Sequence, residues 1–393
     1  MKTTRIFTVL FLLLEINFLS LSAQKPEKVY SIVKQIQAFD WYRTQAKLWK
    51  QEIAKDTADE KAWVNYYAAN RMARMTDAES WNKEKGDYFL DLSAIVSKVE
   101  KAIPNTFEYY HINIWDKGVY DKKQVDYLLK AQAMYPDRME LISNYVNYYE
   151  LNRDKDNMKK YCTKWFNSNE ISSGIIAYNY NMLNSLEDNA IIFTNGDNDT
   201  YPLWLLQYVK GIKKDVSVFN VSLLQIESYR DKLFIENKIP VFEMEKFLKT
   251  FKEEMDYPQA IIRHIIKNTN RPVYMACTMS DAYYKEYEKD LYLTGLAFRY
   301  SETDVDNMAL IRKNYEKIFL LDYLKINFTN DLSETVVAQI NMCYLPAMFK
   351  LYEHYSLSGE NEKKAEVKKL AIKIANEAGK ENEVAPWFEN KKD

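Results

Sequence analysis

The chain has 393 residues, and its 54 basic and 56 acidic side chains give a formal net charge of −2. With only 8 glycines and 9 prolines, long elements and few loops are expected. A hydrophobic content of 47% excludes a disordered chain, which could not bury enough apolar surface to become ordered. The balanced charge excludes a general attraction to nucleic acid, so no nucleic-acid partner is expected.

The first residues have the pattern of a secretory signal peptide. A positively charged start is followed by an apolar stretch over 6–14 and by small residues that suit cleavage at 19–23. Glu15 ends the apolar stretch well short of the roughly 20 residues that a membrane span needs. We therefore expect a signal peptide over 1–23 and an exported, periplasmic or secreted chain that has no membrane span after cleavage.

Residues 24–189 are predicted to form a helical, repeat-like domain. Aromatic residues recur at helical spacing over 61–75, and a helix over 124–135 ends at Pro136. Further helices on both sides of the polar turn 152–157 complete a pattern that resembles tetratricopeptide-type helical hairpins. We interpret the many tyrosines here as packing between hairpins; the alternative is an aromatic surface that faces a ligand.

Residues 190–300 are predicted to form a small α/β domain. Two apolar runs of strand type flank a helix that starts near Pro202 and ends at Gly211, which together make a βαβ unit with a right-handed crossover. Two further strands follow, so a sheet of three to four mostly parallel strands is expected. The candidate strands lie at 190–194, 216–221, 272–276 and 291–300.

The chain returns to helices over 301–393. One long helical segment is expected at 305–328, and the segments 336–356 and 363–378 should form another hairpin. The predicted fold class is therefore mostly α with a small α/β unit, in which tetratricopeptide-like hairpins flank the sheet.

The polar turn after the first strand is the segment that best suits chemistry. It reads Asn195-Gly196-Asp197-Asn198-Asp199-Thr200 and follows the carboxyl end of a strand, where open α/β sheets bind ligands. Its two carboxylates and neighbouring amide oxygens are hard donors that suit Ca²⁺ or Mg²⁺. Asp197 and Asp199 are accordingly the candidate metal ligands; no cofactor is the favoured expectation, and a divalent cation at this turn is the alternative.

A purely structural role explains the same residues. Asp-x-Asp triplets occur three times in the chain, which is close to chance. Asp199 or Thr200, shortly before Pro202, also suits a helix cap, where a carboxylate stabilises the helix dipole. Glu227, Tyr229 and Arg230 follow the second strand and could approach the turn across the sheet edge. The candidate ligand-binding residues are Asn195, Asp197, Asn198, Asp199, Thr200, Ser222 and Tyr229.

No catalytic set of residues is recognised in the sequence. The three histidines lack metal-ligand spacing, and no Ser/His/Asp or Cys/His arrangement has supporting context. The three cysteines are interpreted as buried apolar residues, with one disulfide left open. Whether the chain is an enzyme stays open, and a non-catalytic role is favoured.

Five segments resemble the soluble C-terminal region of large bacterial membrane proteins grouped as Domain of Unknown Function twenty-seven twenty-three. They are 195–204 (NGDNDTYPLW), 209–216 (VKGIKKDV), 220–224 (NVSLL), 271–276 (RPVYMA) and 291–300, within a resemblance that covers 185–325. That family resembles protein O-mannosyltransferases and is classed as glycosyltransferase-like. This chain has Asn195 where the family usually has Asp, has Ser228 in place of a Trp, and lacks the family's many membrane helices.

The resemblance implies a relative of the exported accessory part of that family, in the periplasm of a Gram-negative bacterium. The leading hypothesis is a non-catalytic binding or accessory protein, linked to glycan or glycoprotein assembly, whose partner is an envelope protein or a glycan. The alternative is a glycan-active, glycosyltransferase-like enzyme that holds a divalent cation at Asp197 and Asp199.

Overall fold

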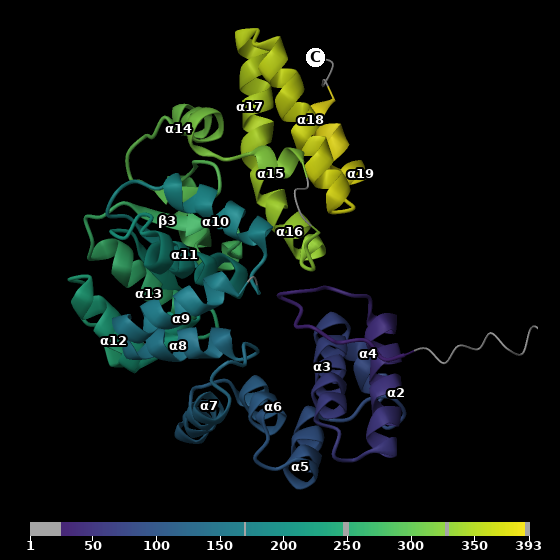
Figure 1. The fold of residues 1–393 in the computed structure, drawn as a ribbon. Helices are drawn as coiled ribbons and strands as arrows, with labels where there is room; N and C mark the ends of the chain where they lie inside the picture. The colour runs from purple at the N-terminus through teal and green to yellow at the C-terminus, as the bar shows by residue number, and fades with distance from the viewer. Residues whose placement is uncertain (1–24, 169, 247–250, 327–329, 390–393) are drawn as a thin grey trace, which may run out of the picture. The chain divides into compact units, whose positions relative to one another are not determined.

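The computed structural model describes residues 25–168, 170–246, 251–326 and 330–389 (Figure 1). The predicted signal peptide lies outside the described residues. The chain divides into two compact units. The first comprises Gln37–Tyr135 with the described residues up to Ile32, and the second comprises Val33–Ile36 with the described residues from Pro136 onward.

Side-chain caps begin most helices of the first unit. Asp59, Asp77, Thr106 and Asp121 each accept a hydrogen bond from a backbone N–H three residues further on, at 2.9–3.2 Å. The helices predicted over 61–75 and 124–135 are confirmed as α3 and α7. The helices described in this unit are α2 (Phe39–Lys55), α3 (Glu60–Thr76), α4 (Ala78–Lys83), α5 (Leu92–Ala102), α6 (Phe107–Lys117) and α7 (Lys122–Met134).

Buried asparagines fasten extended segments of chain to the helices. On α3, the Oδ1 atom of Asn65 accepts the N–H of Val29 at 2.8 Å, while its Nδ2 donates to the helix carbonyl one turn earlier. Asn70 makes the same pair of contacts with its own extended segment and helix turn. In the second unit, Asn181 bonds both the N–H and the carbonyl of Leu320, at 2.8 and 3.0 Å. Each amide thus satisfies a backbone group of an extended segment that has no strand partner.

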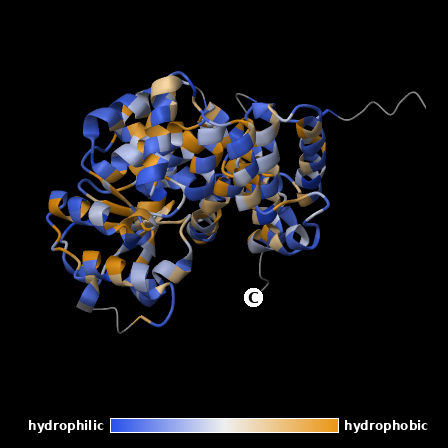
Figure 2. Ribbon diagram, turned by 90° about the horizontal axis from the view of Figure 1, so that it is seen from below, coloured by the Kyte–Doolittle hydropathy of each residue, from blue (hydrophilic) through white to orange (hydrophobic). Residues whose placement is uncertain are grey.

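The second unit contains a five-stranded sheet in the order β2-β1-β3-β5-β4. The central strand β1 pairs in parallel with β2 and β3, whereas β5 pairs antiparallel with β3 and β4. Figure 2 shows hydrophobic strands, in orange, among helices of mixed colour, which fits strands buried by the elements around them. The strands are β1 (Ile191–Thr194), β2 (Ser217–Asn220), β3 (Val273–Ala276), β4 (Leu291–Leu293) and β5 (Ala297–Tyr300).

This sheet confirms the predicted class, mostly α with a small α/β unit, but corrects its details. It has five strands rather than three to four, and only two of its four pairings are parallel. Residues 291–300 form the hairpin β4–β5 instead of one strand. The chain reverses at Gly295, whose φ of +138° strains any other residue, and a Cβ there would lie 2.8 Å from the ring of Phe319.

Arg271 holds the amino edge of the three parallel strands together. Its guanidinium donates to the carbonyls of Asn189 and Ala190, which lead into β1, at 2.7 and 2.9 Å. It also donates to the Ser217 hydroxyl on β2 at 2.8 Å and to Asn237 Oδ1 at 2.6 Å. Because Arg271 lies two residues before β3, one side chain links all three strands.

Helices that precede the sheet in sequence belong to the same unit as the sheet. Both α9 and α10 pack on α11, and the rings of Trp165 and Tyr201 lie 5.4 Å apart. The division by packing therefore falls after Tyr135, whereas the domain boundary predicted from the sequence lies at 189/190. The helices are α8 (Ile142–Asn152), α9 (Lys155–Asn167), α10 (Ser173–Asn184), α11 (Asp197–Lys210), α12 (Glu227–Glu236) and α13 (Asp256–Lys267).

The C-terminal helices also belong to the second unit. The single long helix expected over 305–328 is wrong, because the chain leaves the helix at Phe319 so that Leu320 can pair with Asn181. The expected hairpin is confirmed as α17–α18, which lie side by side in Figure 1. The elements are α14 (Asn307–Lys313), the π-helix η5 (Asn314–Ile318), α15 (Asp322–Lys325), α16 (Glu334–Asn341), α17 (Leu345–Ser358), α18 (Asn361–Glu377) and α19 (Glu381–Val384).

None of the helices in the described ranges is long and apolar enough to cross a membrane.

Candidate functional site

The acidic turn, defined here as residues 195–200, comprises the two residues that follow β1 and the first four residues of α11. Helix α11 begins at Asp197, with Gly196 as its N-cap residue. Gly196 has no side chain that could cap the helix, so the cap comes from Asp199, whose Oδ1 accepts the Gly196 N–H at 2.8 Å. The helix therefore starts before the predicted position near Pro202, and neither Asp199 nor Thr200 is its N-cap residue; Asp199 instead bonds back to the N-cap backbone from the third helical position.

The carboxylate of Asp199 is buried and surrounded by donors. Oδ1 accepts from the Gly196 N–H and from the Thr200 hydroxyl at 3.3 Å. Oδ2 accepts from the Asn195 N–H at 3.3 Å and from the hydroxyl of Thr278, which follows β3. A carboxylate offers about four lone-pair positions, and four donors occupy them here. Burial nevertheless raises the pKa of Asp199, because desolvation outweighs these donors.

Thr200 links this carboxylate to the first two strands. Its hydroxyl lies 2.8 Å from that of Thr194 at the end of β1, and it accepts from Asn220 Nδ2 at 2.9 Å. A hydroxyl has one proton and two lone pairs, so all three contacts are satisfied when Thr200 donates to Asp199 and accepts from the other two. Asn220 Oδ1 in turn accepts the N–H groups of Ser222 and Leu223, both at 3.0 Å.

Pro202 lies inside α11 without breaking it. Proline has no N–H, so the carbonyl of Asn198 loses its usual helical partner. Nδ2 of the buried Asn179 on α10 donates to that carbonyl at 2.8 Å and to the carbonyl of Ile175 at 2.9 Å. Asn179 thus replaces the missing backbone bond, and Asn198 serves through its backbone as well as through its side chain, which donates to the Val33 carbonyl at 3.0 Å.

Asp197 differs from the rest of the acidic turn, because it is exposed and makes no hydrogen bond or ion pair with any described residue. The protein packed around it and the negative charge of Asp199 raise the pKa of Asp197 to about 6. Beside it, Oδ1 of Asn195 is buried and has no hydrogen-bond partner. Of the two carboxylates in the turn, Asp197 is therefore the one that a ligand can reach.

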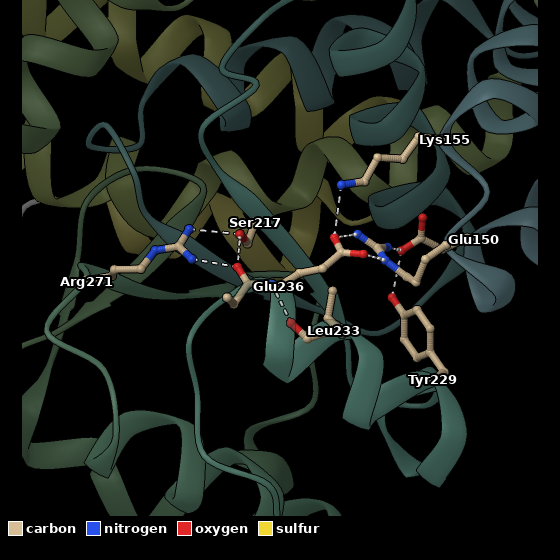
Figure 3. A network of polar contacts seen from close by, with 9 residues as sticks. Glu150, Lys155, Ser217, Tyr229, Leu233, Glu236 and Arg271 are labelled. Carbon is tan, nitrogen blue, oxygen red and sulfur yellow. Dashed lines mark hydrogen bonds and ion pairs between the residues drawn. The ribbon is translucent and has the colours of Figure 1, made fainter.

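The structure does not bring every predicted residue to this turn. Ser222 is exposed, and its backbone N–H reaches the turn only through Asn220. Tyr229 is fully buried in another polar cluster, where its hydroxyl donates to Glu150 Oε1 at 2.8 Å (Figure 3). Its predicted approach to the turn is therefore wrong, because that hydroxyl is committed to the buried carboxylate of Glu150.

The cluster around Tyr229 joins helices α8, α9 and α12. Arg153, between α8 and α9, pairs with Glu150 and also with Glu236 on α12, at 2.9 Å from Glu236 Oε2. Lys155 adds a second cation at 3.3 Å from the same oxygen (Figure 3). Burial raises the pKa of Glu150 in spite of Arg153, whereas Arg153 lowers the pKa of the more exposed Glu236. These contacts hold helices together and leave no group free for a ligand.

The residues of the acidic turn do not fit the proposed metal site. All four acceptor positions of Asp199 already face protein donors, so a cation there would have to displace hydrogen bonds. Asp197 alone remains as a charged ligand. In the part of the chain that the structure describes, no group of three or more His, Cys, Asp or Glu residues is arranged to hold a metal. The cysteines at 162, 277 and 343 are free.

Three residues that complete the acidic turn were missed from the sequence. Thr278 and Asn220 follow or end strands that neighbour β1, so the parallel-sheet prediction itself could have pointed to them. Asn179 comes from the preceding helix, and its only signal is Pro202, which leaves the Asn198 carbonyl without a helical donor.

Comparison with known protein families gives a partial match. Residues 175–241, from α10 to just beyond α12, match the family described as TMEM260-associated domain 2. No curated protein and no solved structure matches the chain. The matched segment contains the whole acidic turn and the strands β1 and β2.

Proposed function

We propose that the chain is an exported, non-catalytic accessory protein of the Gram-negative envelope that binds an envelope protein or glycan during glycan or glycoprotein assembly. Two observations support the setting. Residues 185–325 resemble the soluble region of a glycosyltransferase-like family, and residues 175–241 match TMEM260-associated domain 2. The two regions overlap over 185–241, which holds the acidic turn.

The proposal of a non-catalytic role rests on the carboxylate of Asp199, whose acceptor positions are all occupied by protein donors. A metal-dependent transferase needs carboxylate oxygens that are free to bind a cation and neutralise a diphosphate. Here the more buried of the two carboxylates is fully occupied by donors from the protein. The turn is therefore best understood as a clamp that fixes β1, β2 and α11, with Asp197 as its one free charge.

Calorimetric titration of the mature protein with Ca²⁺, Mg²⁺ and Mn²⁺ tests this reading. We expect no stoichiometric binding at millimolar concentrations, because one exposed carboxylate does not make a cation site. Asp197→Asn is the matched variant, since it removes the free charge without touching a hydrogen bond. Stoichiometric binding by the wild type that this variant loses would contradict the proposal.

The proposed binding of a glycan is tested on an array of envelope glycans, with the mass of each glycan measured after incubation. Retention of a glycan class with unchanged mass is the expected result. A shortened or extended glycan would show catalysis and favour the alternative, a glycan-active enzyme.

One observation favours that alternative without a metal. Asp197 is exposed at the carboxyl end of β1, and its pKa of about 6 lies in the range of a general acid or base. If turnover is found, Asp197→Asn should abolish it while leaving the unfolding temperature nearly unchanged. Turnover that survives this substitution would exclude Asp197 from catalysis.

A further inference from the structure

Arg230 on α12 is a fully buried arginine. It lies between the 3-10 helix η1 (Leu223–Gln225), which follows β2, and the start of α13. Its Nη1 atom donates to the Leu224 carbonyl at 3.3 Å and to the Tyr257 hydroxyl at 2.6 Å. One side of the guanidinium is therefore well anchored.

The other side of the guanidinium has no hydrogen-bond partner. Nε and Nη2 are both buried, and neither finds an acceptor. These two atoms carry N–H groups that point in the same direction, which is the edge that arginine uses to bind the two oxygens of a carboxylate or phosphate.

The neighbouring carboxylate does not fill this edge. Asp231 Oδ1 lies 3.9 Å from Nε, beyond hydrogen-bond distance, and is itself buried without a partner. The rings of Phe242 and Tyr257 lie 5.3 and 6.0 Å from the guanidinium carbon. They offset part of the cost of burying the charge, but ring faces do not accept the in-plane N–H groups.

A buried cation with two unused donors in a fork lacks the acceptors that offset the cost of its burial, and an oxyanion supplies both. We infer that Nε and Nη2 of Arg230 bind a carboxylate or phosphate group of a small ligand. The position fits, because η1 directly follows the carboxyl end of β2, and ligands of α/β sheets gather at such ends. Nε and Nη2 themselves have almost no exposed surface, so an anion reaches them only when a neighbouring side chain moves aside. The Asp231 side chain, which is 35% exposed, and the half-buried Tyr257 are the neighbours that border on solvent.

The site is separate from the acidic turn and does not depend on the proposed function. Its competitor is a purely structural ion pair, in which Asp231 serves as the permanent partner of Arg230. The two explanations predict different effects of removing the charge of Asp231. A fixed negative charge beside the fork weakens anion binding, whereas a structural partner is needed for stability.

Titration calorimetry of the mature chain with phosphate, sulfate and acetate, at an ionic strength matched with chloride, separates these readings. We expect one ion bound per chain, and a rise of about 5 °C in the unfolding temperature at a hundredfold excess over Kd. The preference for phosphate or for acetate then identifies a phosphoryl or a carboxylate ligand.

Arg230→Lys keeps the charge but loses the fork, so its affinity should fall at least tenfold. The matched control is Arg263→Lys on α13, a partly exposed arginine paired with Glu286 at 2.7 Å, which should bind as the wild type does. Asp231→Asn should bind more tightly than the wild type and serves also if Arg230→Lys fails to fold. Two results would overturn the inference: no effect beyond that of chloride, or an Asp231→Asn chain that is destabilised and that no anion restores.

Discussion

Replacing Asp199 by Asn tests whether the acidic turn is a clamp. The amide keeps one oxygen, which can stay with the Gly196 N–H and the Thr200 hydroxyl. Its NH₂ group then faces the Asn195 N–H and Thr278, of which only the hydroxyl can rotate to accept. One donor is left unpaired, at about 1–3 kcal/mol, and removing a buried charge offsets part of this loss. We expect Asp199→Asn to lower the free energy of unfolding by about 2 kcal/mol.

Asp199→Ala should have about twice this effect, because all four donors then lose their acceptor at once. Asp197→Asn is the matched control, since it makes the same chemical change two residues earlier on an exposed side chain. Urea unfolding followed by tryptophan fluorescence reports on this region, because Trp204 is buried on α11. If Asp199→Asn unfolds as the wild type does, or if Asp197→Asn loses as much stability, the clamp explanation is refuted.

Three further predictions concern charge and burial in the second unit. In the folded protein Asp197 has a pKa of about 6, against an ordinary value of 3.8. Its protonated form therefore favours folding below about pH 4, and this contribution is lost as the pH rises through 6. In urea unfolding curves, Asp197→Asn should be on the order of 1 kcal/mol more stable than the wild type at pH 8 and equal to it at pH 4. Arg153→Met leaves the buried Glu150 carboxylate without a cation and should lower the free energy of unfolding by about 3–5 kcal/mol at pH 7. The loss should be smaller at pH 5, because the raised pKa of Glu150 favours its protonation, and equal losses at both pH values would argue against a buried charge. Tyr229→Phe, which removes one hydrogen bond to Glu150, should cost about 1–2 kcal/mol. Arg271→Lys keeps the charge but cannot donate to all four acceptors at once. Thermal unfolding should therefore show a loss of about 2–3 kcal/mol in stability. An unchanged unfolding midpoint would mean that the strand edge does not need this link.

Local patterns predicted the elements of the α/β region well, because short buried strands and capped helices are encoded in neighbouring residues. The runs at 190–194, 216–221 and 272–276 appear as β1, β2 and β3. The direction of the last strands was not predicted, although Gly295 in the middle of an apolar run is a signal for a turn. Reading that glycine as a reversal would have given the hairpin.

Contacts between distant residues explain what the sequence could not show about the site. The turn and the role of Asp199 as a cap follow from residues within five positions of each other. The saturation of its carboxylate depends on Thr278, which lies 79 residues away, and on the register of β3 beside β1. Likewise, nothing near Tyr229 indicates that its hydroxyl belongs to Glu150, on a helix 79 residues earlier.

The bond between Asp199 and Gly196 also bears on the chemical lifetime of the chain. Asn-Gly sequences age readily, because the unshielded glycine nitrogen attacks the asparagine side chain and converts the amide to an acid through a cyclic imide. In the folded protein, the Gly196 nitrogen is held by Asp199 at 2.8 Å, and the Asn195 oxygen is buried. Folding therefore protects residue 195 from deamidation, and an unfolded or Asp199-substituted chain would acquire a new negative charge there with time.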